Sequence, residues 1–323
     1  MKAYYNRTMS SKIESVLKEN GGKYYWMIQY VKDHPELDFQ TGSNNGSSWF
    51  SIYRGTSRVL KITTSGKVSA DKAYKGLLPS FYENPNPELF DKLLTIVNGY
   101  PKFDRYYAKC DCSDKKEGYF QNLIARRCTF NNKPEDDFVI IDKELVIGFK
   151  DKDTEAAWNA PISKELASLI QKARETLSPT RLPVNIKSKY GEFDFLGLNW
   201  DGDIIIMELK QDDPNKTYLS PVQICYYKKQ FTKLLKEIPN LYDDIIRMVN
   251  QKIKLGLINI PQGRKLPTKL SGRIKSYLIV GEESGLSKEV CRRYGSFKDI
   301  VLSDMEAFTC DSDGTLVRCK TLE

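Results

Sequence analysis

The chain has 323 residues, 50 Lys and Arg against 42 Asp and Glu, a formal net charge of +8 and a single histidine. At about 150 residues per domain this length predicts two domains, and the mix of apolar and charged residues is typical of a globular protein. No run approaches the roughly 18 apolar residues of a membrane span, and the N-terminus lacks the apolar stretch of a secretory signal. We therefore expect a cytoplasmic protein with no membrane partner.

The histidine and the cysteines exclude several kinds of catalytic site. His34 precedes a proline, a position that is disfavoured in helices. A lone imidazole argues against Ser-His-Asp and Cys-His hydrolases and against His-rich zinc sites. The only close cysteine pair, Cys110 and Cys112, lacks the two-residue gap of a zinc knuckle. Any hydrolysis by this chain must therefore use carboxylates and lysine, with or without a hard metal ion.

The first half of the chain predicts an accessory α+β domain over residues 1–152. Helices are expected at 87–98 and 118–127, where apolar residues recur with helical spacing. The expected strands are 49–54 and 58–64, joined at Gly55, then 67–74, and a hairpin formed by 138–141 and 145–149. A polar break at 150–154 is the candidate boundary, although it could equally be a surface loop within one larger fold.

The second half predicts an α/β domain over residues 153–323, because helices and strands alternate. The first helix is expected at 164–177 with Ser163 as its N-cap. A basic loop with Pro and Gly is expected at 262–272. The remaining elements are strands at 184–199, 203–210, 277–280, 300–302 and 316–319, and helices at 221–236, 241–255 and 287–294.

Chemistry is concentrated at the end of the strand at 203–210. Glu208 and Lys210 are two residues apart, so they share one face of the strand, at the polar end of a strongly apolar run. Carboxylates are oxygen ligands for Mg²⁺ or Mn²⁺, and a neighbouring lysine can orient water or stabilise charge on a phosphate.

The register of the hairpin decides whether Asp194 joins these two residues. A two-residue turn would turn Asp194 away from Glu208, whereas a three-residue loop, Trp200-Asp201-Gly202, sets Asp194 opposite Glu208. The longer loop needs a left-handed residue at its third position, which glycine supplies. We therefore predict a positive φ at Gly202 and Asp194 beside Glu208.

These residues resemble a known family. Asp194, a strand-turn-strand and Glu208-Leu209-Lys210 are similar to the PD-(D/E)xK nuclease superfamily. Gln223-Ile224-Cys225-Tyr226-Tyr227 on the following helix matches the Q-x-x-x-Y motif of its RecB-like branches. The resemblance implies a restriction-endonuclease-like core, a mixed sheet flanked by helices. It covers about Ser163 to Tyr227, its extension to the end of the chain stays open, and it says nothing about residues 1–150.

The resemblance also implies roles for individual residues. The metal ligands would be Asp194, Glu208 and the carbonyl of Leu209, and Lys210 would be the catalytic lysine. Gln223 and Tyr227 would line the site, and Glu165 is the candidate for the acid on the preceding helix. Phe193 stands where the proline that names the family would be, which makes the motif less specific.

Structural roles compete with these at each position. Glu208 and Lys210 could be an exposed ion pair, and Glu165 could simply favour a helix N-terminus. Ser220-Pro221-Val222-Gln223 reads as a capping box, and Tyr227 could be core. Glu192 is an alternative third acid. Basic residues cluster between Lys228 and Lys275, as nucleic-acid attraction requires, but a solvated surface would look the same.

The sequence thus favours a metal-dependent nuclease that hydrolyses phosphodiester bonds with Mg²⁺ or Mn²⁺, with DNA favoured over RNA as the substrate, in repair or in defence against foreign DNA. The first half would select the substrate through a nucleic-acid surface, a protein partner or self-association. The alternatives are a non-catalytic nucleic-acid-binding module that retains the nuclease fold, and an interaction protein with neither property.

Overall fold

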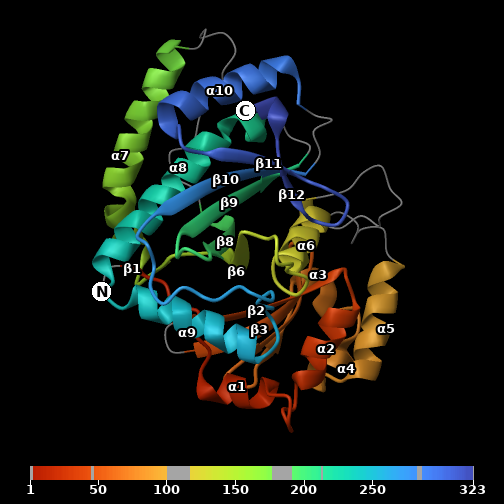
Figure 1. Ribbon diagram of the computed structural model, residues 1–323. Helices are drawn as coiled ribbons and strands as arrows, with labels where there is room; N and C mark the ends of the chain where they lie inside the picture. Colours follow the sequence, from red (N-terminus) through yellow and green to blue (C-terminus); the bar gives the residue numbers. More distant parts are fainter. Residues whose placement is uncertain are drawn as a thin grey trace. The chain divides into compact units, whose positions relative to one another are not determined.

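The computed structural model describes residues 3–44, 47–99, 117–176, 191–211, 214–281 and 286–322. The chain is of the predicted α/β class, with helices and mixed sheets (Figure 1). Residues 184–190 of one predicted strand and Leu177 at the predicted end of a helix lie outside the described residues. Among the described helices, none has both the length and the apolar composition needed to cross a bilayer.

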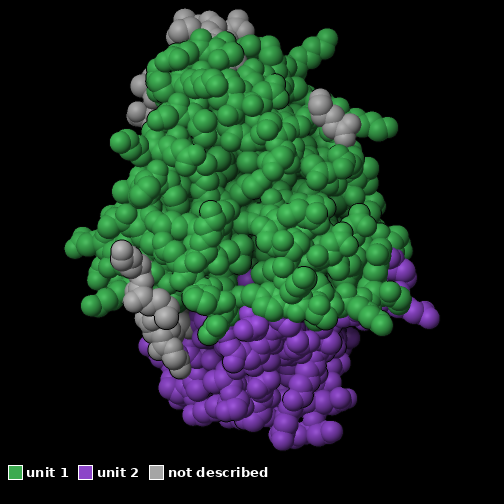
Figure 2. Space-filling model, turned by 60° about the vertical axis from the view of Figure 1, so that its left-hand side comes forward, with its two compact units in different colours: residues 1–5, 135–242, 263–323 green, residues 6–134, 243–262 purple. Residues whose placement is uncertain are grey.

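The chain divides into two compact units, coloured separately in Figure 2. Unit 1 comprises residues 1–5, 135–242 and 263–323, and unit 2 comprises residues 6–134 and 243–262. This division differs from the single boundary at 152/153, because a strand before that boundary pairs within unit 1 and most of a later helix belongs to unit 2. Local composition carries no signal for a chain that leaves a unit and returns to it.

Unit 1 is built on a six-stranded mixed sheet in the order β12-β11-β10-β9-β8-β6. β9 is antiparallel to β8 and parallel to β10, and β10 is parallel to β11. The outer strands, β6 and β12, are both antiparallel to their neighbours. The bounds are β6 Phe138–Leu145, β8 Phe193–Asn199, β9 Ile204–Lys210, β10 Ile274–Val280, β11 Glu306–Cys310 and β12 Leu316–Arg318.

Three helices pack together beside this sheet. α8 (Pro214–Glu237) lies against β9 and β10, and α7 (Lys152–Thr176) and α10 (Lys288–Val301) pack on α8 (Figure 1). β9 is buried from Ile204 to Leu209, as expected for a strand in the interior of a sheet covered on both faces. A short 3₁₀ helix, Lys320–Leu322, follows β12.

Several sequence predictions for unit 1 are wrong. The residues expected to form a hairpin at 138–149 form two strands that do not pair: β6 pairs with β8, and β7 (Gly148–Phe149) pairs with β1 (Ala3–Tyr4). The strand predicted at 300–302 is wrong, because residues 300–301 are the end of α10. The strand β11 was not predicted. α7 and α8 begin 12 and 7 residues before their expected starts (164 − 152 and 221 − 214), because Ser163, the expected N-cap, and Pro221, the expected first residue, lie inside their helices.

Unit 2 is a four-stranded antiparallel sheet with helices, in the order β2-β3-β4-β5. Its apolar core joins the sheet to the helices between residues 11 and 98 and to residues following α9. The strands are β2 Leu37–Asn44, β3 Ser47–Arg54, β4 Ser57–Thr63 and β5 Val68–Ser69. The helices are α1 Ser11–Leu17, α2 Tyr25–Asp33, α3 Lys72–Lys75, α4 Pro79–Glu83, α5 Pro87–Asn98, α6 Glu117–Arg127 and most of α9 (Leu241–Lys254).

Local signals predicted unit 2 well where one segment determines its own conformation. α5 has the predicted bounds, with Pro87 in its first turn and Asn86 as a side-chain cap. The strands β3 and β4 meet at Gly55, whose φ is +60°. The predicted strand at 67–74 is wrong beyond Ser69, because α3 begins at Lys72. His34 ends α2 in an extended conformation, as a residue before proline should.

Candidate active site

The turn between β8 and β9 has the predicted three-residue loop. The Asn199 amide donates to the Asp203 carbonyl at 3.0 Å, and Gly202 has a φ of +88°. The ladder pairs Phe195 with Met207, so one residue further along each strand it sets Asp194 opposite Glu208. Directly opposed residues of an antiparallel pair share a face. The predicted register and the positive φ at Gly202 are therefore confirmed.

Glu208 is a buried carboxylate with two close donors. Its side chain is 3% exposed, and its Oε1 accepts hydrogen bonds from Lys210 Nζ and from Gln223 Nε2, each at 2.5 Å. The Lys210 side chain is 11% exposed, so its ammonium lies at the rim of the core. The interpretation of these two residues as an exposed surface pair is wrong. A buried charge of this kind is tolerated because it is paired and hydrogen-bonded.

The side chain of Asp194, on β8, contacts the backbone of β9, the strand that carries Glu208. Its Oδ2 accepts a hydrogen bond from the Leu209 amide at 2.7 Å. This contact takes the place of a ladder hydrogen bond at the end of the hairpin and holds the Asp194 carboxylate beside the peptide that follows Glu208. Two carboxylates and the Leu209 backbone therefore belong to one short stretch of the hairpin.

Two residues of α8, Gln223 and Tyr227, extend the hydrogen-bond network of Glu208 into the helix. The capping-box interpretation is wrong, because α8 begins at Pro214 and the Ser220 hydroxyl donates back to the Lys216 carbonyl at 2.9 Å. Gln223 Nε2 also contacts the Tyr227 hydroxyl at 3.1 Å, and that hydroxyl donates to the Glu192 carbonyl. A spacing of four places both side chains on one face of the helix. Tyr227 is thus a core residue whose polar end belongs to this network.

The side chains of Glu165 and Glu192 lie at the surface, and Phe193 packs against Tyr227. Glu165 is 60% exposed and forms an ion pair with Lys229 of α8 at 2.6 Å. It lies inside α7, so the helix N-terminus interpretation is also wrong. Phe193, at the position of the missing proline, packs its ring 5.1 Å from that of Tyr227. Glu192, the alternative third acid, is exposed.

The donor set suits a hard cation only in part. Among the described residues there is no group of three or more His, Cys, Asp or Glu side chains that could hold a metal ion. Mg²⁺, however, is commonly held by one or two carboxylates and several waters. Asp194, Glu208 and the Leu209 carbonyl are oxygen donors of that kind. The residues therefore fit a magnesium-type ion with an incomplete protein shell.

Sequence reasoning missed a second network, at the turn end of the same hairpin. Asp203 is 1% exposed and accepts hydrogen bonds from Ser271 Oγ at 2.5 Å, Arg273 Nε at 2.8 Å and Asn199 Nδ2 at 3.0 Å. Burial raises the pKa of Asp203, but these hydrogen bonds and the Arg273 charge outweigh burial, so the pKa lies below its usual value. Lys275 adds a weaker contact at 3.7 Å.

Several of the clustered basic residues are therefore already paired within the protein. Arg273 and Lys275 contact Asp203, and Lys228 contacts Asp304 at 2.5 Å. Lys229 pairs with Glu165, and Lys233 donates to the Trp158 carbonyl. The charge run is less available to a nucleic acid than its composition suggests.

Comparisons of the chain with protein-family models, with curated proteins and with solved structures found no match.

Proposed function

We propose that this chain is a metal-dependent nuclease of the PD-(D/E)xK type that hydrolyses phosphodiester bonds, with DNA as its substrate. The order of elements supports the proposal: a helix (α7), the Asp194 strand, a three-residue turn, the Glu208 strand and a helix with Gln223 and Tyr227. The mixed sheet with helices packed beside β9 and β10 is what a restriction-endonuclease-like core would require.

The observation that carries the proposal is the group of side chains around Glu208. A buried acid, an amine at the rim of the core and an amide from α8 meet at one carboxylate oxygen, and a second acid lies opposite. An ion pair of this burial is a weak source of stability compared with apolar packing. The position of this ion pair beside a second carboxylate, Asp194, is therefore better explained by a catalytic role than by a role in stability.

Each side chain has a definite role in this proposal. Asp194, Glu208 and the Leu209 carbonyl would hold Mg²⁺ or Mn²⁺, which when bound would act as a Lewis acid on the phosphate. Lys210 orients the attacking water and stabilises negative charge as the water oxygen bonds to phosphorus and the bond to the leaving oxygen breaks. The attacking water gives up a proton to solvent, and the leaving oxygen takes one from solvent. Gln223 fixes the Glu208 carboxylate, and Tyr227 fixes Gln223.

A non-catalytic nucleic-acid-binding module is the second candidate. It is favoured by the lack of a three-residue metal-ligand group among the described side chains. It is also favoured by the Lys210 ammonium, which occupies the oxygen that a metal would use. This candidate predicts salt-sensitive binding of nucleic acid without cleavage, because phosphate contacts release counterions.

Cleavage assays separate the two candidates. The purified chain is incubated with plasmid, linear and single-stranded DNA and with RNA, in Mg²⁺, in Mn²⁺ or in EDTA. We expect metal-dependent DNA cleavage that Lys210→Met reduces by at least about a hundredfold, on the scale of losing one preorganised group. The matched control is Lys228→Met, which removes a lysine of α8 with an acidic partner outside the site.

The control should retain activity. Equal loss in Lys210→Met and Lys228→Met, or undiminished cleavage in Lys210→Met, would mean that any cleavage arises elsewhere. Binding without cleavage in every metal would favour the second candidate.

A further inference from the structure

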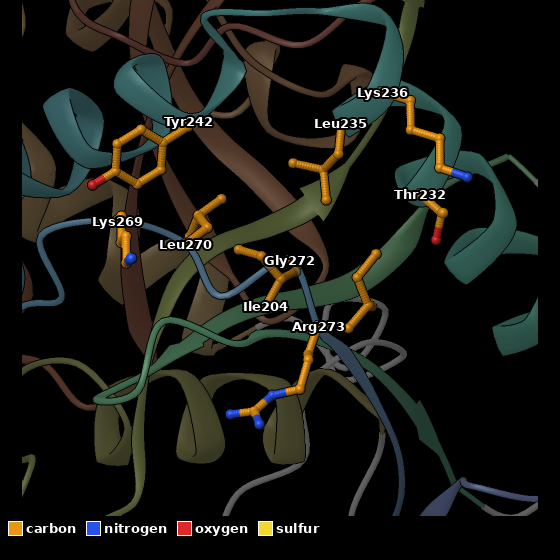
Figure 3. A pocket seen from close by; sticks show the side chains of 10 residues that line it. Ile204, Thr232, Leu235, Lys236, Tyr242, Lys269, Leu270, Gly272 and Arg273 are labelled. Carbon is orange, nitrogen blue, oxygen red and sulfur yellow. The ribbon is translucent and has the colours of Figure 1, made fainter.

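A pocket lies in unit 1 at the opposite end of β9 from Lys210 (Figure 3). Its volume is about 330 Å³, the lower range of small-ligand sites. Its apolar part is formed by Ile204, Leu235, Leu270 and Ile274. Its polar part includes Thr232, Lys236, Tyr242 and Lys269. The pocket thus joins the start of β9, the last turns of α8 and the basic loop before β10.

The polar groups flank the apolar ones on two sides. Figure 3 shows Tyr242 and Lys269 on one side, Thr232 and Lys236 on the other, and Leu235 and Leu270 between them. No carboxylate lines the pocket, and within the described part of the chain neither lysine is in an ion pair. Arg273, also at the pocket, is held by Asp203. The two lysines therefore leave a positive field over an apolar surface.

We propose that this pocket binds one nucleotide of a single-stranded nucleic acid. The base lies on the aliphatic side chains beside the Tyr242 ring, and the phosphates on either side of that nucleotide contact Lys236 and Lys269. Single-strand sites combine such a charged groove with an aromatic stacking surface. The hydroxyls of Thr232 and Tyr242 supply hydrogen-bonding partners for the base edge and the sugar.

This ligand fits the pocket better than a fatty acid. A fatty acid carries one negative charge and an alkyl chain without hydrogen-bonding groups. Such a ligand would leave one lysine and both hydroxyls without partners in the complex. A nucleotide within a strand has a flat base and a phosphate on each side, which matches cations on two sides of an apolar surface.

The binding site is separate from the proposed cleavage site. Glu208 follows Ile204 by four positions on β9, or about 13 Å at ~3.3 Å per residue. Binding here does not require a metal ion or the Glu208 network. Its failure and the failure of the nuclease proposal are therefore distinguishable, and Glu208→Gln should bind the probes below as the parent chain does.

The probe is adenosine 3′,5′-bisphosphate, which carries one base and both phosphates, measured by isothermal titration calorimetry in EDTA. Adenosine 5′-monophosphate, adenosine, inorganic phosphate and laurate are the comparison probes. We expect the bisphosphate to bind tightest, the monophosphate about tenfold more weakly, and the other three weakest. That factor is the scale of one charge-assisted hydrogen bond.

Variants locate the binding. Lys236→Ala and Lys269→Ala should each weaken bisphosphate binding about tenfold. Leu270→Glu, which places a carboxylate on the apolar surface, should abolish it. The matched control is Lys265→Ala, an exposed lysine of the same loop that does not line the pocket, and it should bind as the parent does.

The proposal is overturned by an equal loss in Lys265→Ala, by inorganic phosphate binding as tightly as the bisphosphate, or by laurate binding in its place. It is also overturned if Glu208→Gln removes bisphosphate binding, since the ligand would then lie at the other end of β9.

Discussion

The two ends of the β8–β9 hairpin each hold a buried acid, Asp203 at the turn and Glu208 at the open end. Asp203 is held by the turn itself and by residues 271–275, so its partners fasten a loop to a hairpin. Glu208 is held by its own strand and by α8, with Asp194 opposite. A buried acid alone therefore does not identify a site. The identity and origin of its partners distinguish anchoring from chemistry.

The largest expected effect is on cleavage. Glu208→Gln should lower the cleavage rate by at least about a hundredfold, because it removes a charged metal ligand and the partner of Lys210. Asp203→Asn should leave the rate per folded molecule unchanged, because it disturbs only the turn. The rates are compared after the folded fraction of each protein is measured by circular dichroism. A similar loss in both variants would erase the distinction between the two ends.

The next effect is on the stability of the turn. At Gly202 the φ is +88°, and a Cβ would lie 2.5 Å from the Lys269 carbonyl. Gly202→Ala should therefore lower the free energy of unfolding by about 2 kcal/mol, from strain and the clash together. Gly263→Ala is the control: its φ is +82°, and nothing lies within 4 Å of the added Cβ.

That control should cost about 1 kcal/mol, from the left-handed conformation alone. Urea denaturation measures both. If the two variants are equally stable, contact between the turn and the loop does not help to hold the hairpin.

A smaller effect is expected from the tyrosines of α8. Tyr227→Phe removes the hydroxyl that joins Gln223 to the Glu192 carbonyl, so Gln223 should hold Glu208 less firmly. We expect cleavage to fall about fivefold, corresponding to about 1 kcal/mol for one hydrogen bond. Tyr226→Phe, an equally buried neighbour, should change cleavage less than twofold, roughly the scatter of a neutral substitution. A larger loss of cleavage in Tyr226→Phe than in Tyr227→Phe would contradict the role given to the Tyr227 hydroxyl.

The smallest effect concerns pH. The pKa of Asp203 in the folded chain lies below its usual value of 3.8, so its contribution to stability is complete above about pH 4. The contribution is lost as pH falls through the folded pKa. Arg273 and Lys275 are 68% and 42% exposed, so solvent screens these pairs. The stability difference between the parent and Asp203→Asn should shrink below pH 4, as followed by urea denaturation, and a constant difference would contradict this assignment.

Sequence patterns predicted the features that depend on a few neighbouring residues. Gly202 indicated both the loop length and the register, and the register then placed Asp194 opposite Glu208. Helix starts were harder, because Ser163 looks like an N-cap and Pro221 like a first helical residue, and yet they lie inside α7 and α8. The error at Pro221 also created a false capping role for Gln223.

Contacts between segments far apart in the chain could not be predicted from local sequence patterns. Nothing near Phe138 indicates that its strand pairs with residues 193–199, across a 25-residue helix. The ion pair of Glu165 with Lys229 joins two helices whose packing no local pattern specifies. In the same way, Arg273 looks like a free basic residue until the fold brings it to Asp203. These residues were misassigned because their partners lie far along the chain.

The most direct test of the account is metal binding at the open end of the hairpin. Mn²⁺ is titrated into the parent chain, Glu208→Gln and Asp203→Asn, and the free ion is followed by electron paramagnetic resonance. We predict one bound Mn²⁺ per chain in the parent and in Asp203→Asn, and its loss in Glu208→Gln. Equal binding by all three proteins, or no binding by the parent, would contradict the assignment of a metal-dependent site to Asp194 and Glu208.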